Sequence, residues 1–225
     1  MSAASDLVDR IKAALPGSVT ANLTVTSATW DLYEAYIFSC VLRAAAADGY
    51  VVKLLHGSGV ALPQSGNKRR FVFRRGPGVI YSTGFSYAEI SHSPSTRLEV
   101  HLGVRVDGQS GVAHECDVSV IEADEADLAR TRGFHPRARS VVFACECKYY
   151  TVELPLGLLR EFLGLTTDLR SQAMKSRLAS NVSHSAMPAL MKHHHREWTD
   201  ELTPKSRAEQ RFEGVVEEQL HRHRR

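Results

Sequence analysis

Two segments of the chain alternate apolar and charged residues with a period of two. They read HECDVSVI (residues 114–121) and VFACECKYY (residues 142–150). Because side chains on a β-strand point alternately to opposite faces, Glu146 and Lys148 share one face of the second segment. Asp117 lies on the charged face of the first. An acid and a base within an otherwise apolar strand are costly unless they are paired or used. These segments predict two core strands that carry a polar site.

If the two strands are neighbours, Asp117 and Glu146 can meet around a hard divalent cation. Carboxylate oxygens suit Mg²⁺, which retains several waters and contacts substrate phosphate. Lys148 would then lie beside the attacking water and could stabilise charge on phosphorus. Groups of this kind, in this arrangement, are those needed to hydrolyse a phosphodiester.

These residues resemble the PD-(D/E)xK nuclease superfamily. Asp117 matches the metal-binding aspartate of its first motif, and Glu146-Cys147-Lys148 matches its ExK tripeptide. The proline of the first motif is absent, since Cys116 precedes Asp117. The resemblance implies an α/β, restriction-endonuclease-like, three-layer domain with a central mixed β-sheet flanked by helices. It also implies a Mg²⁺ cofactor, for which Mn²⁺ substitutes.

A glutamate on the first core helix points back to the metal in many members of that family. Glu34 lies in a segment, Thr29–Asp48, that contains no Gly or Pro and leads through Gly49 into an expected strand, Tyr50–Leu55. The resemblance therefore implies catalytic roles for Glu34, Asp117, Glu146 and Lys148, with the three acids as metal ligands. The alternative for Glu34 is an exposed residue on a mostly buried helix.

Further polar residues near these strands allow more than one interpretation. Glu115 shares a face with Asp117 and either approaches the metal or faces a basic neighbour. The thiols and a nearby histidine suggest a zinc site, but C-x-C lacks the usual spacing of structural zinc sites. Cysteine is also among the most buried residue types, so we expect core positions instead. The residues concerned are Cys116, Cys145, Cys147 and His114.

A basic segment, KRRFVFRR, covers residues 68–75. Cations beside a catalytic cleft would contact DNA phosphates and make binding salt-dependent. The alternative is an edge strand that charge protects from aggregation. The predicted nucleic-acid contacts are Lys68, Arg69, Arg70, Arg74 and Arg75.

The organisation of the chain is predicted in three parts. Residues 1–28 form a helix and an extended lead-in, residues 29–204 form the nuclease-like domain, and residues 205–225 form an amphipathic helix and a basic tail. Within the domain we expect helices at Leu156–Leu163 and Thr167–Leu178 and a short strand at Asn181–His184. Residues 76–101 are an insertion to which the pattern assigns no role.

Composition limits the function classes. The 28 Lys and Arg against 25 Asp and Glu give a net charge of +3, too small to indicate a nucleic-acid partner by itself. No apolar run reaches the roughly 20 residues of a membrane span, and four uneven cysteines predict no disulfide framework. We therefore expect a cytoplasmic protein with no membrane partner.

The expected function is a metal-dependent nuclease acting on DNA, an endonuclease in restriction, phage defence or repair. By analogy with enzymes that cut both strands, it would act as a homodimer. The alternative is a catalytically inactive nuclease-like module that binds nucleic acid or a protein.

Overall fold

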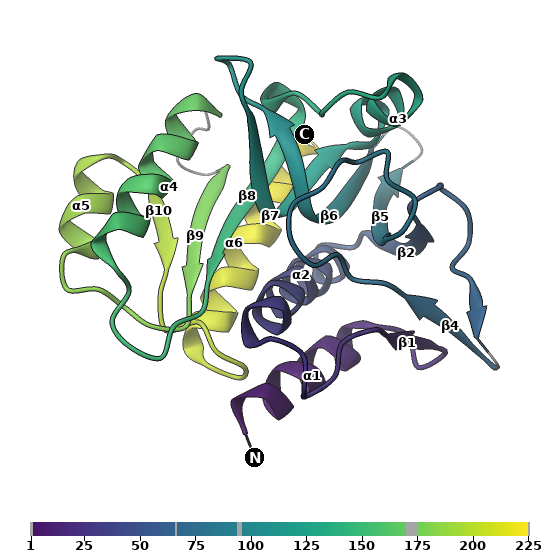
Figure 1. Cartoon of the computed structure of the whole chain (residues 1–225), viewed down its shortest axis with the longest axis horizontal. Helices are drawn as coiled ribbons and strands as arrows, with labels where there is room; N and C mark the ends of the chain where they lie inside the picture. Colours follow the sequence, from purple (N-terminus) through teal and green to yellow (C-terminus); the bar gives the residue numbers. More distant parts are fainter. Residues whose placement is uncertain (1, 66, 94–95, 170–174, 225) are drawn as a thin grey trace.

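The computed structural model describes residues 2–65, 67–93, 96–169 and 175–224 (Figure 1). Its helices are α1 (Ala3–Ala14), α2 (Thr29–Ala47), α3 (Ala123–Arg132), α4 (Leu156–Asp168), α5 (Met187–His193) and α6 (Arg207–His223). Its strands are β1 (Val19–Ala21), β2 (Val51–His56), β3 (Gln64–Ser65), β4 (Lys68–Phe71), β5 (Ser86–Ser93), β6 (Thr96–Asp107), β7 (Ala113–Glu122), β8 (Val141–Lys148), β9 (Ser176–Ser180) and β10 (Glu197–Thr199).

The central sheet is mixed and has the strand order β10-β9-β8-β7-β6-β5-β2. The β2-β5-β6-β7-β8 part is antiparallel, whereas β8, β9 and β10 run parallel. Helix α4 lies between β8 and β9 in sequence and makes the crossover that a parallel pair requires. The two predicted core strands, β7 and β8, are therefore neighbours at the centre of the sheet.

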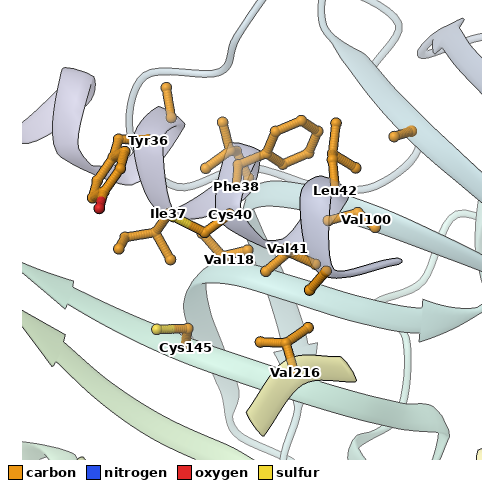
Figure 2. Packing of buried hydrophobic residues seen from close by; sticks show 14 of the residues in the cluster. Tyr36, Ile37, Phe38, Cys40, Val41, Leu42, Val100, Val118, Cys145 and Val216 are labelled. Atoms are coloured by element: carbon orange, nitrogen blue, oxygen red, sulfur yellow. The ribbon is translucent and has the colours of Figure 1, made fainter. Parts of the chain in front are cut away.

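One face of this sheet is covered by α1, α2 and α6. Helix α2 is buried along most of its 19 residues, and Figure 2 shows Ile37, Cys40 and Val41 directed toward the strands that carry Val118 and Cys145. The amphipathic helix α6 lies beside α2 and buries its apolar stripe in the same core (Figure 1). A helix covered all round must be apolar all round, which explains the absence of charge along most of α2.

The opposite face carries α3, α4 and α5. Ala126 and Ala129 of α3 pack with Ile121 and Val141 of the central strands. Phe162 of α4 belongs to a further cluster, formed with residues of β9 and α5. The chain is thus an α/β protein with helices on both faces of a mixed central sheet, as predicted at that level.

A second, three-stranded sheet, β1-β4-β3, lies beside this core and extends to one side of the molecule (Figure 1). The basic segment 68–75 starts with strand β4 of this sheet. Because β4 ends at Phe71, the strand covers only the first half of the basic segment. Phe71 and Phe73 of this segment are buried in the main core, with ring centroids 4.7 Å apart.

Two local predictions are wrong. The segment Thr167–Leu178, expected as a helix, contains the end of α4 and the first residues of β9, and residues 170–174 lie outside the described part. The segment Asn181–His184, expected as a strand, follows β9 and is not a strand. In residues 76–101, to which no role was assigned, β5 inserts between β2 and β6.

Residues from all three predicted parts of the chain contribute to one core cluster. Leu7 and Ile11 of α1 and Phe212 and Val216 of α6 belong to the same core cluster as the residues of α2. The basic end is also ordered onto the core, because Arg224 donates to Asp48 at the C-terminus of α2 at 2.8 Å. Among the helices in the described ranges, none combines the length and apolar character that crossing a membrane requires.

Candidate active site

The candidate site lies where β7 and β8 stop pairing. Their register pairs Val120 with Phe143 and Val118 with Cys145, and the described pairing ends there. Beyond that point the Oδ2 atom of Asp117 accepts the backbone N–H of Cys147 at 2.7 Å. A side-chain acceptor thus replaces a main-chain one, which satisfies the donor and fixes Asp117 between the two strands.

Strand β6 is irregular opposite Asp117. Leu102 pairs with Val118 and Val104 with Cys116, which places Gly103 across from Asp117. Gly103 has φ +55°, and a Cβ there would lie 2.7 Å from the carbonyl oxygen of Gly76. Only glycine meets both demands without strain.

The irregular stretch also changes the face on which Cys116 lies. Regular alternation would place Cys116 on the side of Val118 and Val120, but it packs in a different cluster, with Val104 and Ile121. The alternation of faces is therefore interrupted next to Asp117, where the structure departs from a regular strand.

Lys148 connects the two predicted metal ligands. Its Nζ lies 2.6 Å from Oε1 of Glu146 and 3.8 Å from Oδ2 of Asp117. Burial would lower the pKa of Lys148, but the two carboxylates together raise it, so the amine is held protonated. The three residues that carry the family resemblance are thus brought together.

The ionised forms of Asp117 and Glu146 are disfavoured in this site. Burial first, and then the charge of Asp117, raise the pKa of Glu146 to about 7. Burial also raises the pKa of Asp117, although Lys148 and the Cys147 amide act in the opposite direction. One lysine therefore does not compensate the acids that share this space.

Glu34 reaches the same site from α2. Its pKa is raised to about 8 by burial and then by the negative charges of Asp117, Glu115 and Asp31. The charges of Asp117 and Glu115 therefore act on Glu34 across the space between α2 and β7. Glu34 is only partly exposed, so the interpretation as an exposed helix residue does not hold.

Glu115 belongs to the acidic set and also faces basic residues. It pairs across the sheet with Arg105, and burial followed by the charge of Glu146 raises its pKa. Arg105 and Arg74 act in the opposite direction. Both interpretations of Glu115 from the sequence therefore describe part of its surroundings.

The donor set fits a hard cation. Glu34, Glu115, Asp117 and Glu146 offer only carboxylate oxygens. Burial first, and then the charge of a neighbouring acid, raise the pKa of each, and a bound cation would stabilise their ionised forms. Mg²⁺ needs one or two carboxylates beside its waters. In this arrangement Asp117 and Glu146 are the two that Lys148 already brings together.

A tighter acidic cluster lies elsewhere, and an arginine explains it. Among the described residues, only Cys40, Glu209 and Glu213 place three ligand atoms within 4.8 Å of one another. Arg43 lies among them, with Nη2 2.7 Å from each carboxylate and 3.1 Å from the sulfur. Arg10 adds a second contact to Glu209 at 2.8 Å. This cluster joins α1, α2 and α6 as an ion-pair network.

The predicted nucleic-acid contacts separate into two groups. Lys68, Arg69 and Arg70 are exposed on β4, and Arg75 is exposed beside Asp31 at the start of α2, with a 3.8 Å ion pair. Arg74 differs, because it is 9% exposed, donates to the Val79 carbonyl oxygen and lies over the Phe85 ring. We therefore remove Arg74 from the predicted DNA contacts.

The cysteines occupy core positions, as predicted. All four are buried and free. His114 instead contacts Asp168 at 2.6 Å, and Asp168 also accepts from the Ser110 hydroxyl, which ties the β6–β7 hairpin to the end of α4. In the described residues, no histidine joins a thiol cluster of metal-binding geometry.

One buried charge cluster was missed. Glu99 of β6 receives two bonds from Arg130 of α3 and one from His101 at 2.7 Å. Its sequence signal was the spacing of an acid and a histidine two apart in an apolar strand, the same signal that identified Glu146 and Lys148.

Comparison with known proteins adds no relative. The chain matches no family model, no curated protein and no solved structure at a significant level.

Proposed function

We propose that this protein is a Mg²⁺-dependent deoxyribonuclease with a restriction-endonuclease-like fold. One observation carries the proposal: Lys148 contacts Glu146 at 2.6 Å and lies 3.8 Å from Asp117, at the point where the two central strands separate. A buried acid–base set at a break in the sheet costs folding free energy, and phosphodiester hydrolysis is the chemistry that these groups fit best.

Each residue has a separate role in this proposal. Asp117 and Glu146 would hold Mg²⁺, with Glu34 supporting the same position from α2. The cation, once bound, would neutralise charge on the phosphate and lower the pKa of a water. The protonated amine of Lys148 lies beside both carboxylates and would stabilise the negative charge that develops on the phosphate oxygens.

The exposed cations would supply non-specific affinity. Lys68, Arg69 and Arg70 on β4, together with Arg75, would contact phosphates away from the cleaved bond. The expected consequence is an affinity that falls steeply with salt concentration. Mn²⁺ is proposed to substitute for Mg²⁺.

The test is cleavage of supercoiled and linear DNA by the purified chain with Mg²⁺, Mn²⁺ or EDTA. We expect Lys148→Ala to lower the rate by about a hundredfold to a thousandfold, as for the loss of other groups that stabilise transition-state charge. Asp117→Ala should abolish metal-dependent cleavage. Lys53→Ala, at an exposed position on β2, is the matched control and should retain full activity. Metal-dependent cleavage that survives both site substitutions would reject this site.

One observation favours a second candidate, an inactive module that binds DNA. Among the described residues, the acids of the candidate site do not form a triple of ligand oxygens within 4.8 Å. In this alternative Lys148 would act as a permanent counter-ion to Glu146. DNA binding that is unchanged by Lys148→Ala, with no cleavage under any metal, would favour the inactive module.

A homodimer and a cytoplasmic location remain predictions. Light scattering with and without DNA tests whether the chain forms a homodimer.

A further inference from the structure

Trp30 is placed unusually for a large aromatic residue. It lies in the first turn of α2 and is 65% exposed, although most of that helix is buried. Tryptophan is among the most extensively buried residues on average, and its ring gains free energy from apolar contact. The exposed ring therefore gains no free energy of burial on folding, and a planar ligand that covers it would supply that gain on binding.

Trp30 lies one helical turn before Glu34, a residue of the candidate site. Glu34 lies four residues later, and side chains four apart on a helix are neighbours on one face. The charge of Glu34 is in turn influenced by Asp117 and Lys148. Trp30 thus lies about one helical turn from Glu34, the acid that would support the metal from α2.

A cation accompanies the exposed ring. Asp31, the next residue of α2, pairs with Nε of Arg75 at 3.8 Å, and Nη2 of Arg75 donates to the carbonyl oxygen of Asn22 at 3.2 Å. These contacts hold a half-exposed guanidinium at the start of α2. The start of α2 thus carries an exposed aromatic ring and a guanidinium, the two groups that a nucleotide needs for stacking of its base and pairing of its phosphate.

A cavity at the same end of α2 provides a second, independent observation. Its volume is about 170 Å³, and two aromatic residues line it: Tyr33 of α2 and Tyr149, which directly follows Lys148. The two rings lie 5.5 Å apart at an angle of 58°. The remaining lining residues are Ala3, Asp6, Leu7, Leu202, Thr203 and Pro204. This mainly apolar space with a few polar groups at its walls suits a flat heterocycle.

The geometry points to single-stranded DNA as the substrate class of this site. In a duplex the bases cover each other's faces, so an isolated indole can stack only on a base that is unpaired. Trp30 would stack on one base near the cleaved bond, and the Tyr33–Tyr149 cavity would receive another. This inference rests on the proposed function for the cleavage step, but the binding step can be measured without it.

The experiment uses the intrinsic fluorescence of the chain, which has two tryptophans. Trp198→Phe leaves Trp30 as the single reporter. This protein is titrated with an oligothymidine and with a duplex of equal length, with Ca²⁺ in place of Mg²⁺ so that cleavage does not interfere. We expect saturable quenching by the single strand and little change with the duplex.

Binding affinity is measured with variants of the natural sequence, in which Trp198 is retained. Because stacking on an aromatic side chain contributes strongly to single-strand binding, Trp30→Ala should weaken the oligothymidine complex by about fivefold to a hundredfold in fluorescence anisotropy. Duplex affinity should change less than about twofold. Trp30→Phe should retain most of the single-strand affinity. Val51→Ala, at a position 68% exposed beyond the other end of α2, is the control and should change neither affinity.

The outcomes separate this inference from the proposed function. Quenching by single strands without any cleavage supports the inference and removes the enzyme. Cleavage of duplex DNA with no quenching, or an equal loss of both affinities in Trp30→Ala, overturns the inference and leaves the enzyme. An unchanged single-strand affinity in Trp30→Ala also overturns it.

Discussion

Two buried carboxylates on neighbouring strands of this sheet have opposite electrostatic states. Glu99 on β6 is 1% exposed and Asp117 on β7 is 7% exposed, so both have lost most of their contact with water. Burial raises the pKa of each. For Glu99 the bonds from His101 and Arg130 more than offset burial and hold the pKa below its usual value, whereas the pKa of Asp117 remains raised.

The difference lies in the number of cations available to each acid. Arg130 binds Glu99 through two nitrogens, at 2.8 and 2.5 Å, in the bidentate geometry that stabilises a carboxylate best. Asp117 shares one lysine with Glu146, and the negative charge of Glu115 opposes the ionisation of Asp117. A charge cluster that is fully compensated holds the fold together. A cluster with too few cations retains the capacity to bind another one.

The largest expected effect comes from breaking the compensated cluster. Arg130→Ala leaves Glu99 buried with His101 as its remaining partner in the described cluster, and it removes the contact of Arg130 with the Tyr87 ring. We expect the free energy of unfolding in urea to fall by about 3–5 kcal/mol. Arg97→Ala is the matched control: its ion pairs with Glu89 and Asp127 are partly exposed and should be worth under about 1 kcal/mol. Equal losses for the two variants would contradict the comparison.

The pH dependence of stability should differ in sign between the two clusters. The pKa of Glu146 is raised from 4.5 to about 7, so the folded protein binds more protons than the unfolded chain, and this stability is lost as pH rises from about 4.5 through 7. The shift corresponds to at most about 3 kcal/mol. For Glu99, whose pKa is lowered, stability is instead lost as pH falls below 4.5.

Unfolding curves without metal between pH 5 and 8, on the natural protein and on Glu146→Gln, measure this contribution. The natural protein should lose stability relative to Glu146→Gln as pH rises, and Mg²⁺ should stabilise the natural protein more at pH 8 than at pH 6, since the cation displaces protons. Parallel curves for the two proteins would show that Glu146 is ionised normally.

The smallest expected effect is also the most specific. Asp117→Asn keeps an oxygen that can accept the Cys147 N–H and removes one negative charge from the excess. We expect its free energy of unfolding to be unchanged or higher by about 1 kcal/mol, with metal-dependent cleavage lost. Glu99→Gln, the same change in the compensated cluster, should instead destabilise the protein. Destabilisation of both variants alike would remove the distinction between them.

The residues of the candidate site were accessible from the sequence because each belongs to a regular element. The period of two placed Glu146 and Lys148 on one face, and the uninterrupted helix around Glu34 was predicted almost to the residue. That these elements meet at one point follows from the order of strands in the sheet. No periodicity in the sequence contains that order.

The missed features depend on tertiary contacts. Strand β9 is five residues long and buried throughout, too short for a pattern to distinguish it from a helix. Arg74 follows the end of β4, where the chain turns through Gly76 at φ +80° and directs the guanidinium onto Phe85. Cys116 lies beside the irregularity opposite Gly103, which no local rule for alternation includes.

The position of α6 in the sequence has a consequence for the order of folding. Phe212, Val216 and Leu220 complete the core over α2, yet they follow every strand of the sheet in the chain. During synthesis the sheet and α2 leave the ribosome first, with the surface meant for α6 still open to water. Such an exposed apolar surface is a binding site for chaperones and a hazard for aggregation. The layer that carries Glu34 therefore closes late, and a growing chain would acquire its proposed activity only after α6 has emerged.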